Sequence, residues 1–336
     1  MQSDMTSNYA HQSLIALLIS LIISSSSDAF VQPQTKLQRT QTSSSLCMLS
    51  TTDQIILHQA ATLANKDNTI DRPTAQQIVN NILCPPNEER SRTNAGMEAF
   101  GSDTNSQVIT NDDPRNEYTY GEFPFDSFDL LIDLAASHVV DEETTTTTTT
   151  TTRKQMIDVG SGCGRLPLYA GLTRSDWDVT GIEIGHQLHS LAVGSLQRGI
   201  NEDLFRPIID DTTASVDEAQ ISFYNGNVLP GIDPYFQNTQ SDNDTVQSIL
   251  SQANLLFAYS TAWETDSDQS FNPELGAMVL SSKWSQTLAS TCQNGVVAVT
   301  TDRVLNPEHG WKLLDKMDVD NPSVWGSVGY ISVLEK

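Results

Sequence analysis

A glycine-rich turn between an apolar run and a helical segment constrains the fold more than any other feature of the chain. Residues 156–159 read MIDV, which predicts a short buried strand, and residues 160–164 read GSGCG. Glycines at these positions let the backbone turn sharply and let a ligand approach closely, because no Cβ atom intervenes. A helix is predicted from about Arg165 to Leu172. The segment is therefore a strand–turn–helix unit, from which parallel α/β sheets are built.

The rest of the chain continues this alternation of strands and helices. Further strands are predicted at 177–184, 221–224, 255–259, 296–300 and 329–336, and helices at 186–198 and 273–291. Residues 202–219 and 232–250 are acidic or rich in Asn, Gln and Ser, and they are expected to be loops. Strands that alternate with helices imply a parallel sheet covered on both faces.

The segment before the glycine turn is expected to be mostly helical. One helical stretch is predicted through Ile55, Ile56, His58 and Leu63, and another from Thr74 to Leu83. Residues 86–116 are polar with little periodicity and are interpreted as a loop. A helix is predicted from Phe125 to His138, with Asp126 as its capping residue. Nine consecutive threonines, 144–152, are interpreted as a surface loop, because they offer no apolar face to bury.

The charge of the chain excludes one class of function. The 336 residues carry 18 Lys and Arg against 42 Asp and Glu, a formal net charge of −24. Autonomous binding to nucleic acid is therefore disfavoured, because it requires clustered basic side chains. The four cysteines (Cys47, Cys84, Cys163 and Cys292) are widely spaced and form neither a disulfide framework nor a zinc motif. No metal site is predicted.

The N-terminus has the composition of a targeting segment. Residues 14–23, LIALLISLII, are too few to span a bilayer but fit the apolar region of a secretory signal. The next stretch is rich in Ser and Thr and contains bases but no acid between residues 30 and 52. This order resembles the two-part plastid address of algae with secondary plastids, with a signal peptide at 1–29 and a transit-like segment at 30–52. The alternative is a secretory signal followed by a linker, and no stable membrane span is expected after processing.

The glycine turn also carries a ligand motif. Asp158 precedes Gly160, Gly162 and Gly164 in the pattern D-x-G-x-G-x-G, whereas dinucleotide sites have G-x-G-x-x-G. The pattern resembles the first motif of class I S-adenosylmethionine-dependent methyltransferases. Glu183 ends the next predicted strand, where a carboxylate can hold both hydroxyls of a ribose.

That resemblance extends the candidate cofactor site. Asn227 and Val228 follow the third strand, where such enzymes contact the adenine, and Arg165 closes the glycine motif. The implied fold is a Rossmann-like, mostly parallel sheet with an antiparallel last strand, preceded by a small helical segment at 53–115. The methyltransferase domain would span 116–336, and its cofactor would be S-adenosyl-L-methionine.

The order of the motifs is similar to one particular family. YGEF at 120–123, DVGSGCGR, GIEI, LLFAYSTAW, QNGVVAVT and the terminal SVWGSVGYISVLEK follow the order and spacing of the disruptor-of-telomeric-silencing family of histone lysine methyltransferases. The likeness covers roughly residues 115–336. In that family the YGE loop closes over the methionine half of the cofactor. The corresponding residues here are Tyr120, Gly121 and Glu122.

The acceptor side departs from that family. The family has an Asn pair and an aromatic residue after the fourth strand, whereas residues 259–263 here read YSTAW. Tyr259 and Trp263 are therefore candidate channel walls, because aromatic faces favour a cationic ammonium. Glu122 is a candidate for receiving the acceptor's proton. Cys163, inside the glycine turn, is expected to be packed rather than reactive, and His186 and His189 are expected on a helix surface.

Three functions remain open from the sequence. The first is methylation of a lysine on a non-histone protein, since an acidic chain without basic segments would be repelled by nucleosomal DNA. The second is methylation of a small plastid or secretory-pathway molecule. The third is a non-catalytic cofactor-binding module, because the acceptor-side amides are absent.

Overall fold

The computed structural model describes residues 59–64, 70–100, 118–140, 153–208, 219–231, 235–236, 240–266 and 271–336. All of them belong to one compact unit, which spans 51–336. The expected signal peptide, the transit-like segment and the threonine run lie outside the described residues. No helix among the described ranges is long and apolar enough to cross a membrane.

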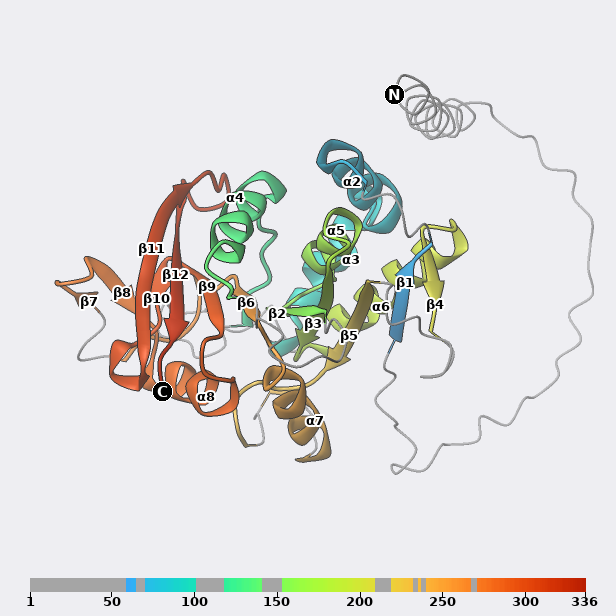
Figure 1. Cartoon of the computed structure of the whole chain (residues 1–336). Coiled ribbons are helices and arrows are strands. Elements are labelled where there is room, and N and C mark those ends of the chain that lie inside the picture. The colour runs from blue at the N-terminus through green and yellow to red at the C-terminus, as the bar shows by residue number, and fades with distance from the viewer. Residues whose placement is uncertain are drawn as a thin grey trace, which may run out of the picture. The chain divides into compact units, whose positions relative to one another are not determined.

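A nine-stranded sheet forms the centre of the described unit (Figure 1). Its order is β11-β12-β9-β6-β2-β3-β5-β1-β4. The strands are β1 (Gln59–Leu63), β2 (Lys154–Val159), β3 (Trp177–Glu183), β4 (Phe205–Pro207), β5 (Gln220–Asn225), β6 (Leu255–Ala258), β9 (Val297–Thr301), β11 (Trp311–Val319) and β12 (Ser327–Leu334). The five central strands, β9 to β5, are parallel, and β12 pairs antiparallel with β9. The predicted Rossmann-like sheet with an antiparallel last strand is thus confirmed.

Helices cover both faces of the sheet, as the predicted alternation required. They are α4 (Phe125–Ala136), α5 (Arg165–Thr173), α6 (His186–Asn201), α7 (Gln240–Leu250) and α8 (Ser282–Thr291). Side chains alternate across each strand, so Leu255 and Phe257 of β6 enter the core under α4, α5 and α6. Their neighbours Leu256 and Ala258 enter the opposite core under α7 and α8 (Figure 1).

The N-terminal segment differs most from its prediction. Residues 59–63, the end of the first predicted helical stretch, form β1, which pairs antiparallel with β5. The predicted second helix is confirmed as α2 (Arg72–Ile78) continued by the π-helical turn η2 (Val79–Leu83). The predicted loop contains the short helices η3 (Pro86–Glu88), α3 (Glu89–Gly96) and η4 (Glu98–Phe100). Helix α3 has no apolar stripe. The buried side chain of Arg92 holds it in place instead.

Three further segments differ from their sequence prediction. The expected loop at 232–250 contains α7, and β4 lies in the expected loop at 202–219. The helix expected over 273–291 is a helix only from Ser282. Its first part contains β8 (Ala277–Val279), and β7 (Phe271–Asn272) lies just before it. These two strands form a small sheet with β10 (Arg303–Val304). For β4 and β8, pairing with distant strands overrode the local pattern, since β4 pairs with β1 and β8 pairs with β10. The short helix η6 (Pro307–His309) and the long strand β11 had no prediction.

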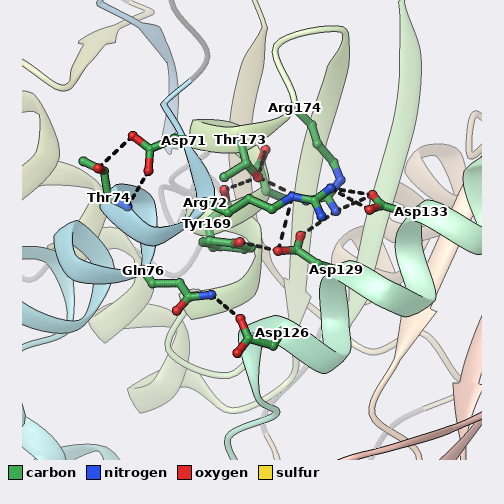
Figure 2. Close-up of polar contacts among 11 residues, drawn as sticks. Asp71, Arg72, Thr74, Gln76, Asp126, Asp129, Asp133, Tyr169, Thr173 and Arg174 are labelled. Atoms are coloured by element: carbon green, nitrogen blue, oxygen red, sulfur yellow. Dashed lines mark hydrogen bonds and ion pairs between the residues drawn. The ribbon is translucent and has the colours of Figure 1, made fainter. Parts of the chain in front are cut away.

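A charged clamp ties α4 to α2 and α5 (Figure 2). Asp129 of α4 is buried, and its Oδ1 accepts from Arg174 Nη2 at 2.6 Å, while Tyr169 Oη donates to its Oδ2. Asp133, one turn later, binds Arg174 at 3.0 Å and Arg72 at 2.6 Å. We define Arg72, Asp129, Asp133, Tyr169 and Arg174 as the clamp.

The capping residue predicted for α4 does not cap the helix. Asp126 makes no capping hydrogen bond; its Oδ1 instead accepts from Gln76 Nε2 of α2 at 2.6 Å. The residue before the helix is Pro124, whose fixed φ suits a helix entry. Because α4 follows the segment at 118–124 directly, the clamp and this contact fix where that segment ends.

Candidate cofactor and acceptor site

The strand order reverses between β2 and β6, and this reversal indicates where a ligand site is expected. The chain runs outward from β2 through β3 to β5, and then returns to β6 on the other side of β2. In such sheets ligands bind outside the carboxyl ends of the strands at this switch point. A cavity open to solvent lies there, and it is lined by residues that follow β2, β3, β5 and β6.

The glycine turn follows β2 with an unusual backbone. Gly160, Gly162 and Gly164 have φ of +76°, +57° and +82°, in the left-handed region that favours glycine. The amides of Gly160 and Ser161 both donate to the carbonyl of Ile182, at 2.9 and 3.0 Å. The turn is thereby fixed to β3. A Cβ at Gly162 would lie 2.8 Å from Cε2 of Tyr120, so only glycine fits there.

Gly164 has a different role from the other two glycines. It does not line the cavity, and a Cβ at this position would lie 2.7 Å from Cζ of Phe223. Gly164 therefore allows α5 to pack closely against the sheet, rather than contacting a ligand as predicted.

Glu183 meets the glycine turn through its carboxylate. Its Oε2 accepts from the amide of Gly162 at 2.8 Å, and its Oε1 accepts from the amide of Gly185 at 2.7 Å. Burial raises the pKa of Glu183 to about 7, although the two backbone hydrogen bonds oppose the shift. A carboxylate can accept about four hydrogen bonds, so further donors can be accommodated. This arrangement suits the predicted contact with the hydroxyls of a ribose.

Asp158 is a second buried carboxyl in the same cavity. It has no hydrogen-bond or ion-pair partner within the described ranges, and burial raises its pKa to about 8, with the nearby charge of Glu183 as the second cause. An uncompensated carboxylate in such a place is costly. The cavity is thus prepared to accept positive charge.

Two neutral polar groups complete this end of the cavity. The hydroxyl of Ser161, which sequence reasoning missed although it lies inside the motif, is buried and has no partner in the described part of the chain. Asn227 follows β5 as predicted, and its Oδ1 accepts from the amide of Leu229 at 2.9 Å. Val228 lies beside it on the cavity wall.

The segment around Tyr120 lies against the glycine turn. Tyr120 Oη donates to Glu122 Oε1 at 2.8 Å and lies 3.2 Å from Cys163 Sγ. Burial raises the pKa of Tyr120 well above its usual value. Gly121 faces the ring of Tyr259, since a Cβ there would lie 2.9 Å from Cε1. The segment therefore connects the glycine turn with the residue that follows β6.

Glu122 and Arg165 bind each other rather than pointing into the cavity as free groups. Arg165 Nη1 lies 2.7 Å from Glu122 Oε2, and Arg92 Nε lies 2.8 Å from Oε1. Burial raises the pKa of Glu122, but the charge of Arg165 and hydrogen bonds from Tyr120 and Arg92 outweigh it, so the pKa is lowered overall. These contacts give Glu122 a positioning role and do not support its predicted role as a proton acceptor.

Two residues that position this segment were missed by sequence reasoning. Arg92 lies in the segment interpreted as a loop, and no pattern marked it. Glu98 also lies there; its Oε2 accepts from the amide of Gln187 at 2.9 Å, in the first turn of α6. Both join the N-terminal segment to the cavity wall.

The acceptor side is aromatic, as predicted. Tyr259 and Trp263 both line the cavity, and the ring of Trp263 stacks on Trp284 at 3.9 Å. Asn321, in the turn between β11 and β12, is buried, and its Nδ2 donates to Tyr259 Oη at 3.0 Å. Tyr259 thus keeps its own O–H proton for a further acceptor. Asn321 was missed because β11 and its turn had no sequence prediction.

The predicted site residues are brought together, with one exception already described. Tyr120, Gly121, Glu122, Asp158, Gly160, Gly162, Arg165, Glu183, Asn227, Val228, Tyr259 and Trp263 all line the same cavity. Arg165 is the one base among the described lining residues, and Glu122 neutralises it.

The histidines belong to helix α6 and have no ligand geometry. His189 is buried, and burial lowers its pKa to about 4, with the nearby His186 as a second cause. The described ranges contain no group of three or more His, Cys, Asp or Glu side chains that could hold a metal ion.

The residues present fit a nucleoside with a cationic tail. The buried hydroxyl of Ser161 needs a partner, the backbone at Gly160 and Gly162 leaves room for close approach, and Glu183 offers paired acceptors beside the turn. Asp158 lines the same cavity, and its buried carboxyl can become negatively charged opposite a cation.

Comparison with known proteins supports no assignment from sequence. No protein-family model matches the chain, and no curated protein matches it. The solved structures that resemble it include methyltransferases. An RNA methyltransferase from Salinibacter ruber in complex with S-adenosyl-L-homocysteine is 18% identical over 64% of this chain and 95% of its own, with a TM-score of 0.34.

Two other structures give similar values. Magnesium protoporphyrin IX methyltransferase from Synechocystis PCC 6803 with bound S-adenosylmethionine is 12% identical over 66% of this chain and 89% of its own, with a TM-score of 0.31. A 16S rRNA adenine methyltransferase from Catenulisporales acidiphilia is 13% identical over 61% and 91%, with a TM-score of 0.32. The strand order and the switch point, not these scores, define the fold as Rossmann-like.

Proposed function

We propose that the chain is an S-adenosyl-L-methionine-dependent methyltransferase. The observation that carries the proposal is the pair of buried carboxyls, Asp158 and Glu183, beside a glycine turn at the switch point of the sheet. The turn and Glu183 would hold the nucleoside, and Asn227 with Val228 would face the base. Asp158 would balance the positive charge of the methionine half, against which Tyr120 and Gly121 close.

In the proposed mechanism the protein mainly aligns the methyl donor with its acceptor, and it need not supply a reacting group of its own. When bound, S-adenosyl-L-methionine supplies an electrophilic methyl group on a sulfonium. The chain fixes the direction of attack and excludes water, and these effects can lower a barrier substantially. The aromatic rings of Trp263 and Trp284 form an apolar wall, and Tyr259 offers an O–H donor fixed by Asn321.

For the acceptor we propose an amine, specifically a lysine of a non-histone protein. The resemblance to histone lysine methyltransferases supports a lysine, and the chain's net charge of −24 supports a basic partner other than nucleosomal DNA. The described lining offers no unpaired base to bind an anionic acceptor. An amine that enters the cavity beside this aromatic wall would lose its proton more easily, because burial disfavours the charged form.

Transfer of tritiated methyl groups tests the proposal. The full chain is incubated with labelled S-adenosyl-L-methionine and organelle extract, with the Gly162→Val variant as the matched control. We expect label in a protein band that is absent with the variant. Label in the organic phase would instead identify a small-molecule acceptor, and no label despite measurable cofactor binding would identify a non-catalytic binding module.

We also propose delivery to a plastid, on the composition of residues 1–52. The test is a fluorescent reporter fused to residues 1–55. Plastid fluorescence is expected, secretory fluorescence would favour the alternative, and cytosolic fluorescence would refute the targeting assignment.

A further inference from the structure

The short helix η4 brings a carboxylate from the N-terminal segment to the wall of the cavity. Glu98 is the first residue of η4 and is partly buried. Its Oε2 accepts from the amide of Gln187 at 2.9 Å, in the first turn of α6, where Gly185 offers no side chain to cap the helix. Glu98 therefore supplies a cap that α6 lacks locally, and the same residue lines the ligand cavity.

This carboxylate lies close to the one that is expected to bind a ribose. Glu98 Oε2 is 3.4 Å and Glu183 Oε1 is 3.1 Å from the position that a Cβ at Gly185 would occupy. The two oxygens therefore flank one point, between the end of β3 and the start of α6. Burial is the main cause of the raised pKa of Glu183, and the charge of Glu98 adds to it, so the two carboxylates interact.

Packing on the other side holds Glu98 in place. A Cβ at Gly96, the last residue of α3, would overlap Cβ of Tyr120, so α3 lies directly against the residue that packs on the glycine turn. Arg92 of the same helix lies 2.8 Å from Glu122 Oε1. Because Glu98 follows α3 closely, its carboxylate is held between α3 and α6.

The described lining of the cavity does not compensate the charge of this pair. Arg165 is the one base there, and it is bound to Glu122 at 2.7 Å. Leu188 Cδ1 lies 3.8 Å from the same point at Gly185 and offers no donor. Both carboxylates have acceptor capacity left. A ligand that fits them carries two neighbouring hydrogen-bond donors, as hydroxyls on adjacent carbons do, and hydrogen bonds to carboxylates are strong ones.

We propose that Glu98 and Glu183 share the two hydroxyls of the cofactor's ribose, one hydroxyl to each carboxylate, so that the N-terminal segment completes the cofactor site. The inference rests on the proposed function and deepens it. It gives Glu98 a part in specificity, because the site then selects a nucleoside with a free vicinal diol. A phosphate on either hydroxyl would meet two carboxylates and be repelled.

The experiment combines a change in the ligand with a change in the protein. Calorimetry with the full chain measures the affinities for S-adenosyl-L-homocysteine and for its 2′,3′-dideoxy analogue. Glu98→Ala should weaken binding of S-adenosyl-L-homocysteine about tenfold, which is the usual effect of losing one hydrogen bond to a charged group. The dideoxy analogue should bind the variant and the unaltered chain within about twofold, because its contact with Glu98 is already absent. Glu89→Ala, which removes an exposed carboxylate of the same segment outside the cavity lining, is the control and should leave both affinities unchanged.

Two results would overturn the inference. One is equal weakening of both ligands by Glu98→Ala, which would show that Glu98 only caps α6, and the other is an unchanged affinity for S-adenosyl-L-homocysteine. If Glu98→Ala folds poorly, Glu98→Gln keeps an amide oxygen for the amide of Gln187, and a loss confined to the ligand with hydroxyls is again expected.

Failure of the proposed function gives a different result. In that case the unaltered chain binds neither S-adenosyl-L-methionine nor S-adenosyl-L-homocysteine. Adenosine and 2′,3′-dideoxyadenosine, followed by saturation-transfer NMR, then decide the inference. A preference for adenosine that Glu98→Ala abolishes supports it, and the absence of any preference overturns it.

Discussion

Two groups of acids in this molecule have opposite surroundings. In the clamp, Asp129 and Asp133 of α4 meet the guanidinium groups of Arg72 and Arg174 (Figure 2). In the cavity, Asp158 and Glu183 face no cation among the described residues. Burial therefore raises the pKa of both cavity carboxyls. The compensated acids hold helices together, and the uncompensated ones are available to a cationic ligand.

The largest effect is expected from a substitution that breaks the clamp. Asp129→Ala should destabilise the fold by about 3–5 kcal/mol, because it leaves the buried guanidinium of Arg174 without its closest partner. Urea denaturation measures the change. Asp133→Ala is the matched control, and since that side chain is 47% exposed, a loss of about 1 kcal/mol or less is expected. Equal losses in the two variants would show that burial of the pair does not matter.

The second prediction disrupts the cavity while the clamp stays intact. Gly162→Val should weaken binding of S-adenosyl-L-methionine by about 100-fold or more, roughly 3 kcal/mol. The reason is that a branched side chain must adopt φ of +57° and overlap Tyr120. Gly194→Val in α6 is the control, because nothing lies within 4 Å of its Cβ position. Calorimetry in which both variants bind equally well would contradict the assignment of the glycine turn.

The third prediction concerns pH. Without a ligand, the pKa values of Asp158 and Glu183 are raised to about 8 and about 7. A cationic cofactor favours their charged forms, so its affinity should rise with pH and level off above about pH 8. A change of roughly tenfold between about pH 6 and about pH 8 is expected, with proton release on binding. S-adenosyl-L-homocysteine, which lacks the sulfonium charge, should show a smaller change.

The same shifts affect the stability of the free chain in the opposite direction. Both carboxyls have pKa values raised above those of the unfolded chain, so their contribution is complete below about pH 4 and is lost as pH rises through about 7 to 8. Thermal melts with and without S-adenosyl-L-methionine should therefore diverge as pH rises. Parallel curves would show that the carboxyls do not sense the ligand.

The smallest effect concerns the exposed part of the clamp. Arg72 is 47% exposed, so Arg72→Ala should cost about 1 kcal/mol or less, and the cost should shrink further at high salt. Urea denaturation at low and high salt measures it. A loss as large as that of Asp129→Ala would contradict the distinction between buried and exposed pairs in the clamp.

The sequence predicted the part of the molecule that local patterns determine. The central strands, the glycine turn and Glu183 could be found because period, spacing and residue type all agree there. Asp158, Asn227 and Tyr259 then follow from the rule that ligands lie at the carboxyl ends of parallel strands. The same information could not show that Arg165 is bound to Glu122, since that depends on a helix–loop contact across the fold.

Segments whose structure depends on distant partners were predicted wrongly. Strand β1 exists because it pairs with β5, and β7 and β8 exist because they pair with each other and with β10. Helix α3 has no apolar stripe and is held by Arg92, which binds Glu122 and the carbonyls of Cys84 and Pro85. Such contacts leave no periodic signal in the chain.

The central claim is that the uncompensated carboxyls of the cavity bind a cationic nucleoside cofactor. The most direct measurement is calorimetric titration of S-adenosyl-L-methionine into the reduced full chain, in two buffers of different ionisation enthalpy below about pH 8. The account predicts one site and a buffer-dependent heat that reports proton release. Absence of binding, or binding whose heat is the same in both buffers, would contradict it.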